Sequence, residues 1–447
     1  MIGAAPPNVT PARPVPDFAV GGVGDPGTRL LSGPDPSAGA EPYAHHLARM
    51  GPLPPPAMTD DLRALTRESG LLGRGGGGFP LARKLEAAIA APGVPLVVVN
   101  ASESEPASRK DRTLCRNRPH LVLDGAAAAA AIVGADEVTV HVHRGSTDAH
   151  DGLVRAMGER RAGGAVDPLW RISLGPDRYV AGESSAIASL LAGGDARPRF
   201  SRIPMATRGP SGRPTVVSNA ETMAHLGFLL RSGPGFWRSG GTPAAPGSRL
   251  LTLTGSVPVP GRVLELVGRG TIGEILSEAG HFAVPSAVLV GGYGGTWLDG
   301  ETAWQTPFDP EALRCVGAQP GCGLIGVLPH GACGLTETAR LVRYLADESA
   351  GQCGPCVAGL PAMADACEAL ARGDLRRRGI RRLESVTQLV SGGGACSHPD
   401  GAARLVRSAL DIFEDDVARH LAGKACRGSS HPPVFSVPLV DPGSEWR

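Results

Sequence analysis

The sequence predicts an α/β protein that continues into a small β-rich unit and ends in a helical bundle. Three observations support this prediction. Helix-like and strand-like segments alternate over residues 59–142, short strand-like runs separated by Gly and Pro follow over 248–301, and helical periodicity dominates from residue 335 to about 421. No repeat of fixed period is evident.

The alternating part begins with a well-signalled helix. Thr59 is a suitable N-cap, Asp60 and Asp61 follow in the first turn, and Gly70 lies beyond the end. A second helix is expected over residues 81–91, and the apolar run 94–99 predicts a buried strand that ends at Asn100. A helix over 124–134 and a strand over 137–142 complete the alternation.

The sequence pattern changes from about residue 248 onward. Strand-like runs at 250–254, 261–266 and 287–290 surround one short helix near 271–279, and helices are expected near 335–349, 356–372, 377–391 and 401–421. These segments predict six parts: an irregular Pro- and Gly-rich segment 1–57, an α/β domain 58–247, a β domain 248–301, a connecting segment 302–334, a helical domain 335–424 and an irregular tail 425–447.

Composition excludes several classes of protein. The 447 residues include 44 basic and 43 acidic ones, so charge gives no case for binding nucleic acid or an anionic membrane. No apolar run approaches the roughly 18–20 residues that a membrane helix needs. The first residues have neither the basic nor the apolar region of a signal peptide. Nine cysteines in so long a chain favour reduced thiols or metal ligands over a disulfide framework.

A glycine loop beside rare lysines is the first candidate site. Lysine occurs only at Lys84, Lys110 and Lys424 among the 44 basic residues, and the first two flank the stretch that opens with Gly73-Arg-Gly-Gly-Gly-Gly-Phe-Pro80. Glycine amides and an ammonium group suit a phosphate. The loop matches the dinucleotide fingerprint by letter, but a helix and not a strand precedes it, which disfavours a standard Rossmann site. A plain flexible linker is the alternative.

Three further polar patches follow predicted strands or open predicted helices. Asn100-Ala-Ser-Glu-Ser-Glu-Pro106 stands at the end of the buried strand, where open α/β sheets bind ligands. Its glutamates form either a solvated turn or hydrogen bonds to a ribityl chain and a flavin ring, and residues 110–112 form an ion-pair brace or are purely structural. The other patches are residues 179–184 and 214–222, where a helix N-terminus can receive a phosphate.

The cysteines suggest a metal centre. Cys353-Gly-Pro-Cys356 has ligand spacing, and Cys396 lies in a second glycine-rich turn. Zinc, a redox dithiol and an iron–sulfur cluster all remain open, although a distant third thiolate favours the cluster. His398 or water could complete the ligand set. The remaining cysteines lack ligand spacing and are expected to be inert thiols: Cys115, Cys315, Cys322, Cys333, Cys367 and Cys426.

Together these blocks resemble the flavin-bearing subunit of respiratory complex I, which is the F-subunit family of the NADH-quinone oxidoreductases, and of related NAD-dependent formate dehydrogenases and hydrogenases. The resemblance runs in order from about Leu62 to Leu421. It implies a Rossmann-like FMN-binding domain, a β-grasp domain over residues 248–301 and a C-terminal helical bundle that carries a [4Fe–4S] cluster. It also implies that NADH gives hydride to FMN, which passes electrons singly through the cluster to a partner.

The resemblance carries residue roles onto this chain. It implies Glu105 and Glu183 as catalytic residues and three metal ligands, Cys353, Cys356 and Cys396. The implied FMN-binding residues are Gly73, Arg74, Gly75, Gly76, Phe79, Lys84, Asn100, Ser102, Glu103, Tyr179, Gly182, Val217, Ser218, Asn219 and Thr222.

Several positions depart from the family pattern. Ser102 replaces an aspartate of the acidic turn, and Ser184 replaces a second glutamate near the nucleotide. The family's lysine and adenine-stacking phenylalanine fall on Ser201 and Pro204. Ala350 stands where the family has its first cluster cysteine. The flavin side is therefore largely kept, while the NADH side and one cluster ligand are altered.

These departures leave three functions to compare. The first is an NADH-oxidising flavoprotein, the second an FMN and cluster relay that takes electrons from another donor such as a ferredoxin, and the third an inactive docking scaffold, against which the retained Lys84 argues. The resemblance further implies a small iron–sulfur or ferredoxin-like partner, a membrane-bound redox complex, and a cytoplasmic location at the inner face of the membrane through such partners.

Overall fold

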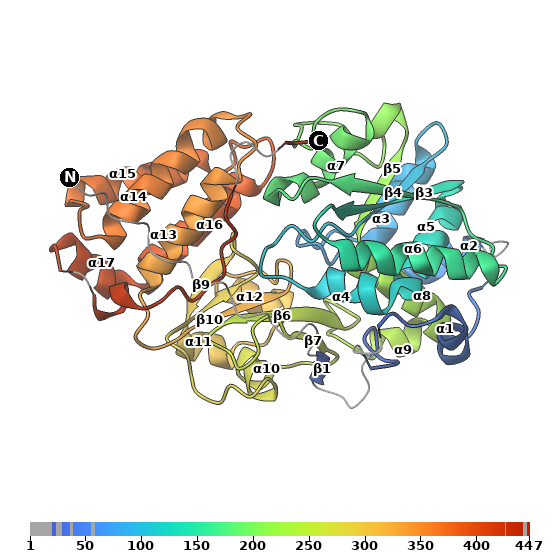
Figure 1. Ribbon diagram of the computed structural model, residues 1–447, viewed down its shortest axis with the longest axis horizontal. Coiled ribbons are helices and arrows are strands. Elements are labelled where there is room, and N and C mark those ends of the chain that lie inside the picture. The colour runs from blue at the N-terminus through green and yellow to red at the C-terminus, as the bar shows by residue number, and fades with distance from the viewer. Residues whose placement is uncertain (1–19, 24–28, 36–38, 55–58, 425, 441–444) are drawn as a thin grey trace, which may run out of the picture.

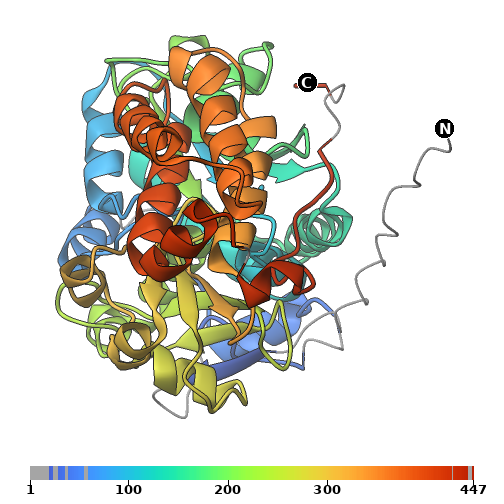
Figure 2. The same cartoon turned by 90° about the vertical axis from the view of Figure 1, so that its left-hand side faces the viewer.

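The computed structural model describes residues 20–23, 29–35, 39–54, 59–424, 426–440 and 445–447. Within these residues the chain forms two β-sheets and a helical bundle that lie beside one another (Figure 1). The view turned by 90° shows the helices of the bundle stacked in front of the sheets (Figure 2). Much of the predicted irregular segment, residues 1–19, 24–28, 36–38 and 55–57, lies outside the described residues.

Four parallel strands form the sheet of the α/β part. Their order is β4 (Leu169–Gly175), β3 (Glu137–His143), β2 (Leu96–Asn100) and β5 (Thr215–Asn219). β2 and β5 are both buried along most of their length, as expected for parallel strands covered on both faces, and β2 is apolar up to Asn100. The surrounding helices are α1 (Tyr43–Met50), α2 (Thr59–Ser69), α3 (Leu81–Ala90), α4 (Lys110–Asn117), α5 (Pro119–Val133), α6 (Thr147–Ala162), α7 (Ser184–Leu191), α8 (Ala220–Ser232) and α9 (Pro234–Arg238).

The order of this sheet reverses between β2 and β5. The chain proceeds outward from β2 to β3 and β4, and then returns to pair β5 with the other edge of β2. Asn100 and Asn219 are register partners at the carboxyl ends of these two strands. Open parallel sheets bind ligands beyond the strand ends at such a reversal. The polar patches predicted after two separate strands therefore meet at one place.

The second sheet is mixed and has six strands. Its order is β1 (Val20–Val23), β7 (Val263–Leu266), β6 (Arg249–Gly255), β10 (Leu324–Leu328), β8 (Ala287–Val290) and β9 (Thr296–Asp299). β6 and β7 form an antiparallel pair, and β10 lies between β6 and β8, parallel to β6. Helix α10 (Ile272–Glu278) packs its apolar side chains into the core of this sheet. The strand order and the covering helix are those of a β-grasp.

Two strands of this sheet come from outside the predicted β domain. β10 lies in the predicted connecting segment, which also holds α12 (Pro310–Cys315), while α11 (Gly300–Gln305) begins at the predicted boundary. β1 belongs to the segment predicted to be irregular, as does α1. The boundary placed at residue 301 therefore cuts the sheet, because the short apolar run of β10 pairs with strands that are distant in sequence. The division into domains itself stays a prediction.

The C-terminal part is a helical bundle, as predicted. It contains α13 (Gly334–Asp347), a π-helical turn (Pro355–Gly359), α14 (Leu360–Ala371), α15 (Arg377–Val390), α16 (His398–Ile412) and α17 (Glu414–Leu421). The segment predicted as one helix over 401–421 is divided at Phe413, whose ring is buried against Trp297. The apolar faces of these helices share one core with part of the second sheet.

The C-terminal tail follows a defined path in its described residues. A short 3₁₀ turn (Arg427–Ser430) leads to Phe435, which is 1 % exposed within the core of the bundle and the second sheet. Glu337 accepts a hydrogen bond from the backbone N–H of Phe435 at 3.2 Å. Trp446 returns to the α/β part, where its carbonyl accepts from the N–H of Ala196 at 2.6 Å. The tail predicted to be irregular thus connects all three parts.

The fold class is confirmed as α/β with a Rossmann-like parallel sheet and a helical C-terminal region. Among the described residues, none of the helices has the length and apolar character needed to cross a membrane.

Candidate functional site

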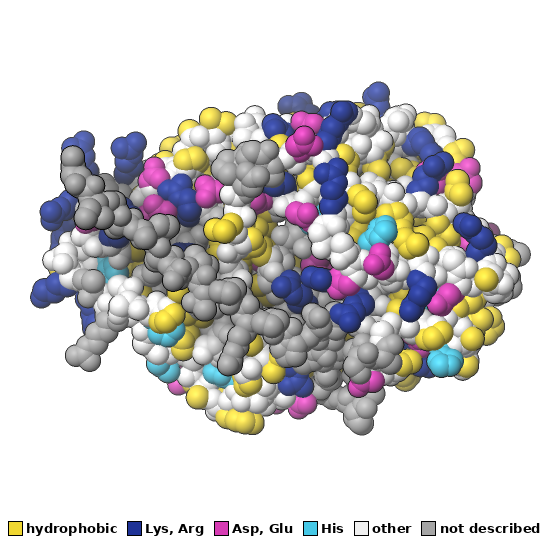
Figure 3. Space-filling model, in the orientation of Figure 1, with side chains coloured by type: hydrophobic (Ala, Val, Ile, Leu, Met, Phe, Trp, Pro, Cys, Tyr) yellow, Lys and Arg dark blue, Asp and Glu magenta, His cyan; other side chains and the backbone are white. Residues whose placement is uncertain are grey.

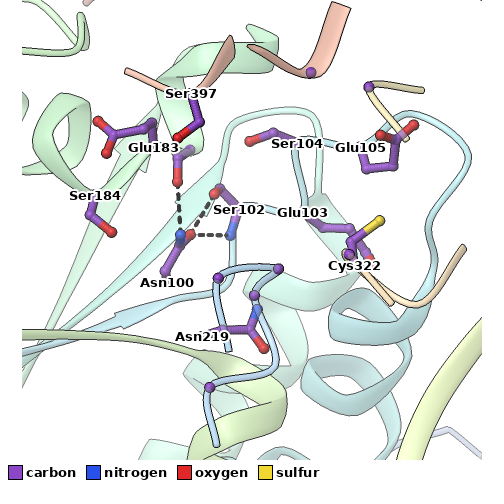
Figure 4. Close-up of a pocket in the computed structure, with 18 of the residues that line it drawn as sticks. Asn100, Ser102, Glu103, Ser104, Glu105, Glu183, Ser184, Asn219, Cys322 and Ser397 are labelled. Atoms are coloured by element: carbon purple, nitrogen blue, oxygen red, sulfur yellow. Dashed lines mark hydrogen bonds between the residues drawn. The ribbon is translucent and has the colours of Figure 1, made fainter. Parts of the chain in front are cut away.

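A cavity of about 590 Å³ lies where the two sheets and the bundle meet. Its volume is in the range of small-molecule and cofactor sites. Asn100, Ser102 and Asn219 face the same space as Cys322 of the second sheet's loops and Ser397 of the bundle (Figure 4). Most of the predicted site residues line it: Gly73, Gly75, Gly76, Phe79, Lys84, Asn100, Ser102, Glu103, Glu105, Tyr179, Gly182, Glu183, Val217, Ser218, Asn219, Thr222 and Cys396.

The glycine loop lies directly against the end of β5. A Cβ atom at Gly75 would be 3.1 Å from Cβ of Asn219. Gly76 and Gly78 have φ angles of 105° and 59°, a region of backbone conformation that favours glycine. The loop therefore presents its backbone, rather than side chains, to the cavity.

Arg74 is the predicted FMN ligand that does not line the cavity. Its side chain is buried, and the guanidinium donates to the carbonyl of Pro246 at 2.8 Å. Its backbone N–H donates to Oγ1 of Thr222 at 2.8 Å. Burial lowers the pKa of Arg74 to about 9. Arg74 thus holds the glycine loop against the rest of the protein. Its position in the loop predicts a positive charge at the cofactor, but its guanidinium group does not line the cavity.

Lys84 extends from α3 into the cavity. Its Nζ donates to the carbonyl of Val217, the residue before the last two of β5, at 3.0 Å. Burial lowers the pKa of this ammonium group. Since one backbone carbonyl uses only one of its three donors, Lys84 keeps hydrogen-bonding capacity for an anionic ligand.

Asn100 connects two walls of the cavity. Its Nδ2 donates to the carbonyl of Gly182 at 2.8 Å, and its Oδ1 accepts from Oγ of Ser102 at 2.6 Å (Figure 4). The Ser102 hydroxyl is therefore already occupied by a neighbouring side chain. This explains how the cavity accommodates a serine at a position where the family pattern has a carboxylate.

Lys110 forms the predicted brace beneath the strand ends. Its Nζ lies 2.9 Å from Oδ1 of Asp111 and 3.0 Å from Oε2 of Glu221, and all three side chains are buried. Burial opposes the charge of Lys110, but the two carboxylates hold its pKa above the usual value. Nδ2 of Asn219 donates to Asp111 at 2.6 Å, so the brace also fixes the end of β5. Because Lys110 is enclosed by fixed partners, its role is structural.

Two predicted carboxylates serve as helix caps. Glu103 has a φ angle of 45° and accepts from the backbone N–H groups of Asp111 and Arg112 at 3.0 and 2.8 Å, at the start of α4. Glu183 accepts from the N–H groups of Ser185 and Ala186 at the start of α7. Negative charge is favourable at helix N-termini. Both residues line the cavity, but these carboxylate contacts are structural ones.

Glu105 has a different environment from the other two glutamates. Its Oε2 accepts from the N–H of Tyr293 at 2.9 Å and from the hydroxyl of Tyr179 at 3.2 Å. Among the described residues its buried Oε1 has no hydrogen-bond partner. Burial raises the pKa of Glu105 to about 7, despite these two donors. Glu105, one of the two residues predicted to be catalytic, can therefore exchange a proton near neutral pH.

The cavity has unpartnered polar atoms and open space that suit FMN. The buried Oγ of Ser104 and Oε1 of Glu105 face it without partners among the described residues. A Cβ at Gly182 would come within 1.9 Å of the Ser104 hydroxyl, so only glycine leaves this space open. Unused polar atoms, a backbone cradle and Lys84 together suit a ligand with a phosphate and a polar ring.

The three predicted metal ligands gather at the bundle side of the cavity. Cys396 lines the cavity, whereas Cys353 and Cys356 do not. Burial and, to a smaller extent, the thiols of Cys353 and Cys396 together raise the pKa of Cys356 to about 12. Burial likewise raises the pKa of Cys396, with a contribution from Cys353. The three sulfur atoms therefore lie close enough to interact, which fits a common cluster.

His398 is occupied within the protein. Its Nε2 lies 2.7 Å from the carbonyl of Leu345, and a carbonyl can only accept, so Nε2 carries the proton. Its Nδ1 has no partner among the described residues. Burial lowers the pKa of His398 to about 4. The neutral ring also packs against Tyr179, with ring centroids 5.4 Å apart.

Sequence reasoning missed the cavity wall from the second sheet and the bundle. Cys322, expected to be inert, lines the cavity, and its thiol donates to the carbonyl of Gly291. Arg404 of α16 lines the cavity and donates to the carbonyl of Gly294 at 3.1 Å. These residues carry no motif of their own, so only the packing of the three parts identifies them.

The positions that depart from the family pattern do not all border the cavity. Ser102 and Ser184 line it, whereas Ser201 and Pro204 are exposed and do not. The ring of Trp446 packs elsewhere in the α/β part, with the guanidinium carbons of Arg178 and Arg197 at 4.3 and 5.0 Å from its centroid, and it does not line the cavity.

Two family models match this chain. The Nuo51 FMN-binding domain matches residues 66–227, and the NADH-ubiquinone oxidoreductase-F iron-sulfur binding region matches residues 336–420. The F subunit of the NADH-quinone oxidoreductase of Mycobacterium bovis is 30 % identical over 386 residues, which cover 82 % of this chain and 86 % of that protein. The corresponding F 2 subunit of Rhizobium meliloti is 28 % identical over 82 % of this chain and 90 % of that protein.

Solved structures of similar fold include the NAD+-reducing [NiFe]-hydrogenase. Its air-oxidized state gives a TM-score of 0.80 at 26 % identity, over 96 % of this chain and 70 % of that one. Its H2-reduced state gives 0.76 at 28 % identity, over 83 % of this chain and 64 % of that one. The matched region of this chain thus spans only about two thirds of the hydrogenase chain.

Proposed function

Because this chain belongs to the F-subunit family of the NADH-quinone oxidoreductases, we propose that its cavity binds FMN and that Cys353, Cys356 and Cys396 hold the adjacent iron–sulfur cluster. The family consists of NADH-binding flavoproteins that carry FMN and a [4Fe–4S] cluster, and the chain is an oxidoreductase of this type. When bound in this cavity, FMN would supply the chemistry that couples hydride transfer from NADH to one-electron transfer through the cluster.

A single observation carries this assignment. The glycine loop, the ends of β2 and β5, and Cys396 all border the same cavity. A flavin in that cavity and a cluster on Cys396 would be neighbours, as one-electron transfer between them requires. Electron transfer between the two cofactors explains why Cys396 and the glycine loop line the same cavity.

The chain's own residues bind and orient the cofactor. We assign phosphate recognition to the glycine loop amides and Lys84, because they combine backbone donors with a cation. Asn100 and Asn219 fix the strand ends, and Gly182 leaves space above them. Glu105 holds a proton that can leave near neutral pH, which suits a group beside a reacting ring.

The family works within multi-subunit redox complexes, and α15 offers a surface for the next electron carrier. Five arginines, Arg376, Arg377, Arg378, Arg381 and Arg382, are exposed at its N-terminal end. Basic side chains gather over this helical region at the left of Figure 3. The other end of α15 contacts the π-helical turn that contains Cys356. Val390 of α15 lies so close to Gly359 of this turn that a Cβ atom on the glycine would meet it. We propose that an acidic, ferredoxin-like iron–sulfur protein docks here, within a complex at the inner face of the membrane.

A second candidate function is a relay for a donor other than NADH. It is favoured by Ser184, Ser201 and Pro204, which supply neither the charge nor the aromatic ring of the family pattern. If the missing charge at Ser184 weakens NADH binding, Ser184→Glu should lower the KM for NADH with little change in FMN content. An unchanged KM would favour a different donor.

The anaerobic visible spectrum of the purified protein tests both functions. We expect a flavin spectrum that bleaches when NADH is added. Bleaching by dithionite but not by NADH would favour the relay. A colourless protein that cannot be reconstituted with FMN would contradict both, and would leave the docking scaffold.

A further inference from the structure

A second cluster of metal-binding side chains lies in the bundle, apart from the cavity. The ligand atoms of Cys333, His420 and Cys426 all lie within 4.8 Å of one another. Cys333 and His420 are buried, Cys426 is partly buried, and none of the three lines the cavity. They are also distinct from the three cysteines assigned to the iron–sulfur cluster.

The fold brings Cys333 to two residues that are close to each other in the sequence. Cys333 is the N-cap of α13, and its Sγ accepts from the N–H of Thr336 at 3.4 Å. His420 lies in the last turn of α17, and Cys426, six residues later, stands just before the 3₁₀ turn of the tail. Cys333 precedes His420 by 87 residues, so no ligand spacing links the two cysteines in the sequence, and both are expected to be inert from the sequence.

The imidazole of His420 is oriented as a metal ligand requires. Its Nδ1 lies 2.9 Å from the carbonyl of Leu370, which can only accept, so Nδ1 carries the proton. The lone pair of Nε2 therefore points toward the two thiols. Metal-binding histidines are commonly fixed in this way, by a hydrogen bond from the other ring nitrogen to a carbonyl. In this structure Nε2 accepts from the N–H of Cys426 at 3.2 Å, a contact that a metal ion would replace.

The dimensions of the cluster suit a small tetrahedral ion. Zinc bonds to sulfur at about 2.3 Å and to nitrogen at about 2.0 Å, which places tetrahedral S and N ligands about 3.6 Å apart. Sγ of Cys333 and Nε2 of His420 are 3.9 Å apart. Two thiols and one imidazole are donors that zinc prefers over calcium or magnesium.

We propose that Cys333, His420 and Cys426 form a structural zinc site that anchors the C-terminal tail to the helical bundle. The fourth position is left to water or to Asp416. That carboxylate precedes His420 by one helical turn and lies close enough to Cys426 to act on its thiol electrostatically. The ion would join the start of α13, the end of α17 and the tail at one point.

Metal analysis of the purified holoprotein with crossed variants tests this site. We expect about one zinc per chain in the wild type, beyond the iron of the cluster. Cys333→Ser, Cys426→Ser and His420→Asn should each lose the zinc but keep FMN and iron. Cys396→Ser should lose the iron but keep the zinc, which excludes zinc that has entered the cluster site. Cys367→Ser, at a buried cysteine of the same bundle, should keep both metals.

Titration of apoprotein with Co²⁺ adds a measurement that does not depend on which metal the protein acquires during expression. Apoprotein should develop the visible absorption of thiolate-bound cobalt in the wild type and in Cys367→Ser, but not in Cys426→Ser, which replaces one sulfur atom with oxygen at a partly buried position. Zinc that is absent from the wild type, zinc that is retained in all three ligand variants, or a Cys333–Cys426 disulfide in the purified protein would each overturn the proposal.

Discussion

The hydroxyl of Tyr179 donates to Glu105 across the cavity, at 3.2 Å, from the turn before α7 to the strand-end patch. The contact joins two polar patches that are far apart in the sequence. Desolvation raises the pKa of Glu105 and also raises that of Tyr179 well above its usual value. The tyrosine thus stays neutral throughout the physiological range, and the glutamate alone titrates.

Glu105 should make the stability of the protein depend on pH. Its folded pKa of about 7 exceeds the ordinary value of 4.5, so the folded state holds this proton more tightly than the unfolded state. The stabilisation is fully present below pH 4.5 and is lost as the pH rises through about 7. Glu105→Gln should flatten the pH dependence of the thermal midpoint over this interval. Glu384→Gln, at an exposed position, should leave it unchanged, and an unaltered slope in the Glu105 variant would refute the assignment.

Lys84 should contribute to FMN affinity. A charge-assisted hydrogen bond is worth about 1.5–3 kcal/mol, so Lys84→Ala should weaken FMN binding roughly 10- to 100-fold. Fluorescence titration of apoprotein with FMN measures this change. Lys424→Ala is the matched control, because that exposed lysine lies far along the chain and does not line the cavity. Equal affinities of the two variants would place the phosphate elsewhere.

Gly182 should tolerate no side chain. The Cβ of Gly182→Ala would approach Oγ of Ser104 to 1.9 Å and Oγ of Ser102 to 2.6 Å, and would displace both hydroxyls at the cavity. We expect the variant to fold but to retain little FMN during purification. Gly158→Ala on α6 has nothing within 4 Å of its added Cβ and should bind FMN normally. A fully yellow Gly182 variant would show that this side of the cavity is not used.

Restoring a fourth thiol should strengthen the cluster. Ala350 is partly exposed, and it stands three residues before Cys353, where the family pattern has its first ligand. Ala350→Cys should increase the iron and sulfide bound per FMN and slow cluster loss in air, whereas Cys396→Ser should remove both. Iron content that is identical in Ala350→Cys and in the wild type would mean that another residue already completes the ligand set.

Sequence alone predicts the parts of this fold that have strong local signals. The apolar run predicts β2, and the acidic first turn predicts α2, although Thr59, the predicted N-cap, is already the first residue of that helix. The position of Asn100 at the end of a buried strand predicts that it lies in a ligand site. β10 is not predicted from the sequence, because its short apolar run can be recognised as a strand only from its pairing with β6 and β8. The relation of the bundle to the cavity is likewise a matter of packing between distant segments.

The roles of individual side chains are harder to predict than their positions. Glu103, Glu183 and Arg74 lie in motifs of the right composition, yet their charged groups cap helices or fasten a loop. A sequence records that a carboxylate is present but not which N–H groups surround it. The same limit applies to Cys333, which only the fold brings to His420 and Cys426.

The buried position of Phe435 has a consequence for how the protein is made. Its ring occupies the space beside Gly255 and Gly326, where a Cβ on either glycine would meet it, so it completes the contact between the β-grasp sheet and the bundle. Gly255 and Gly326 are far from Phe435 in the sequence, so the sheet and the bundle reach their final packing only after the chain through Phe435 has been synthesised. The core of the α/β part does not contain Phe435 and can form earlier. Until Phe435 is in place, the cavity wall that the bundle supplies lacks this contact with the second sheet.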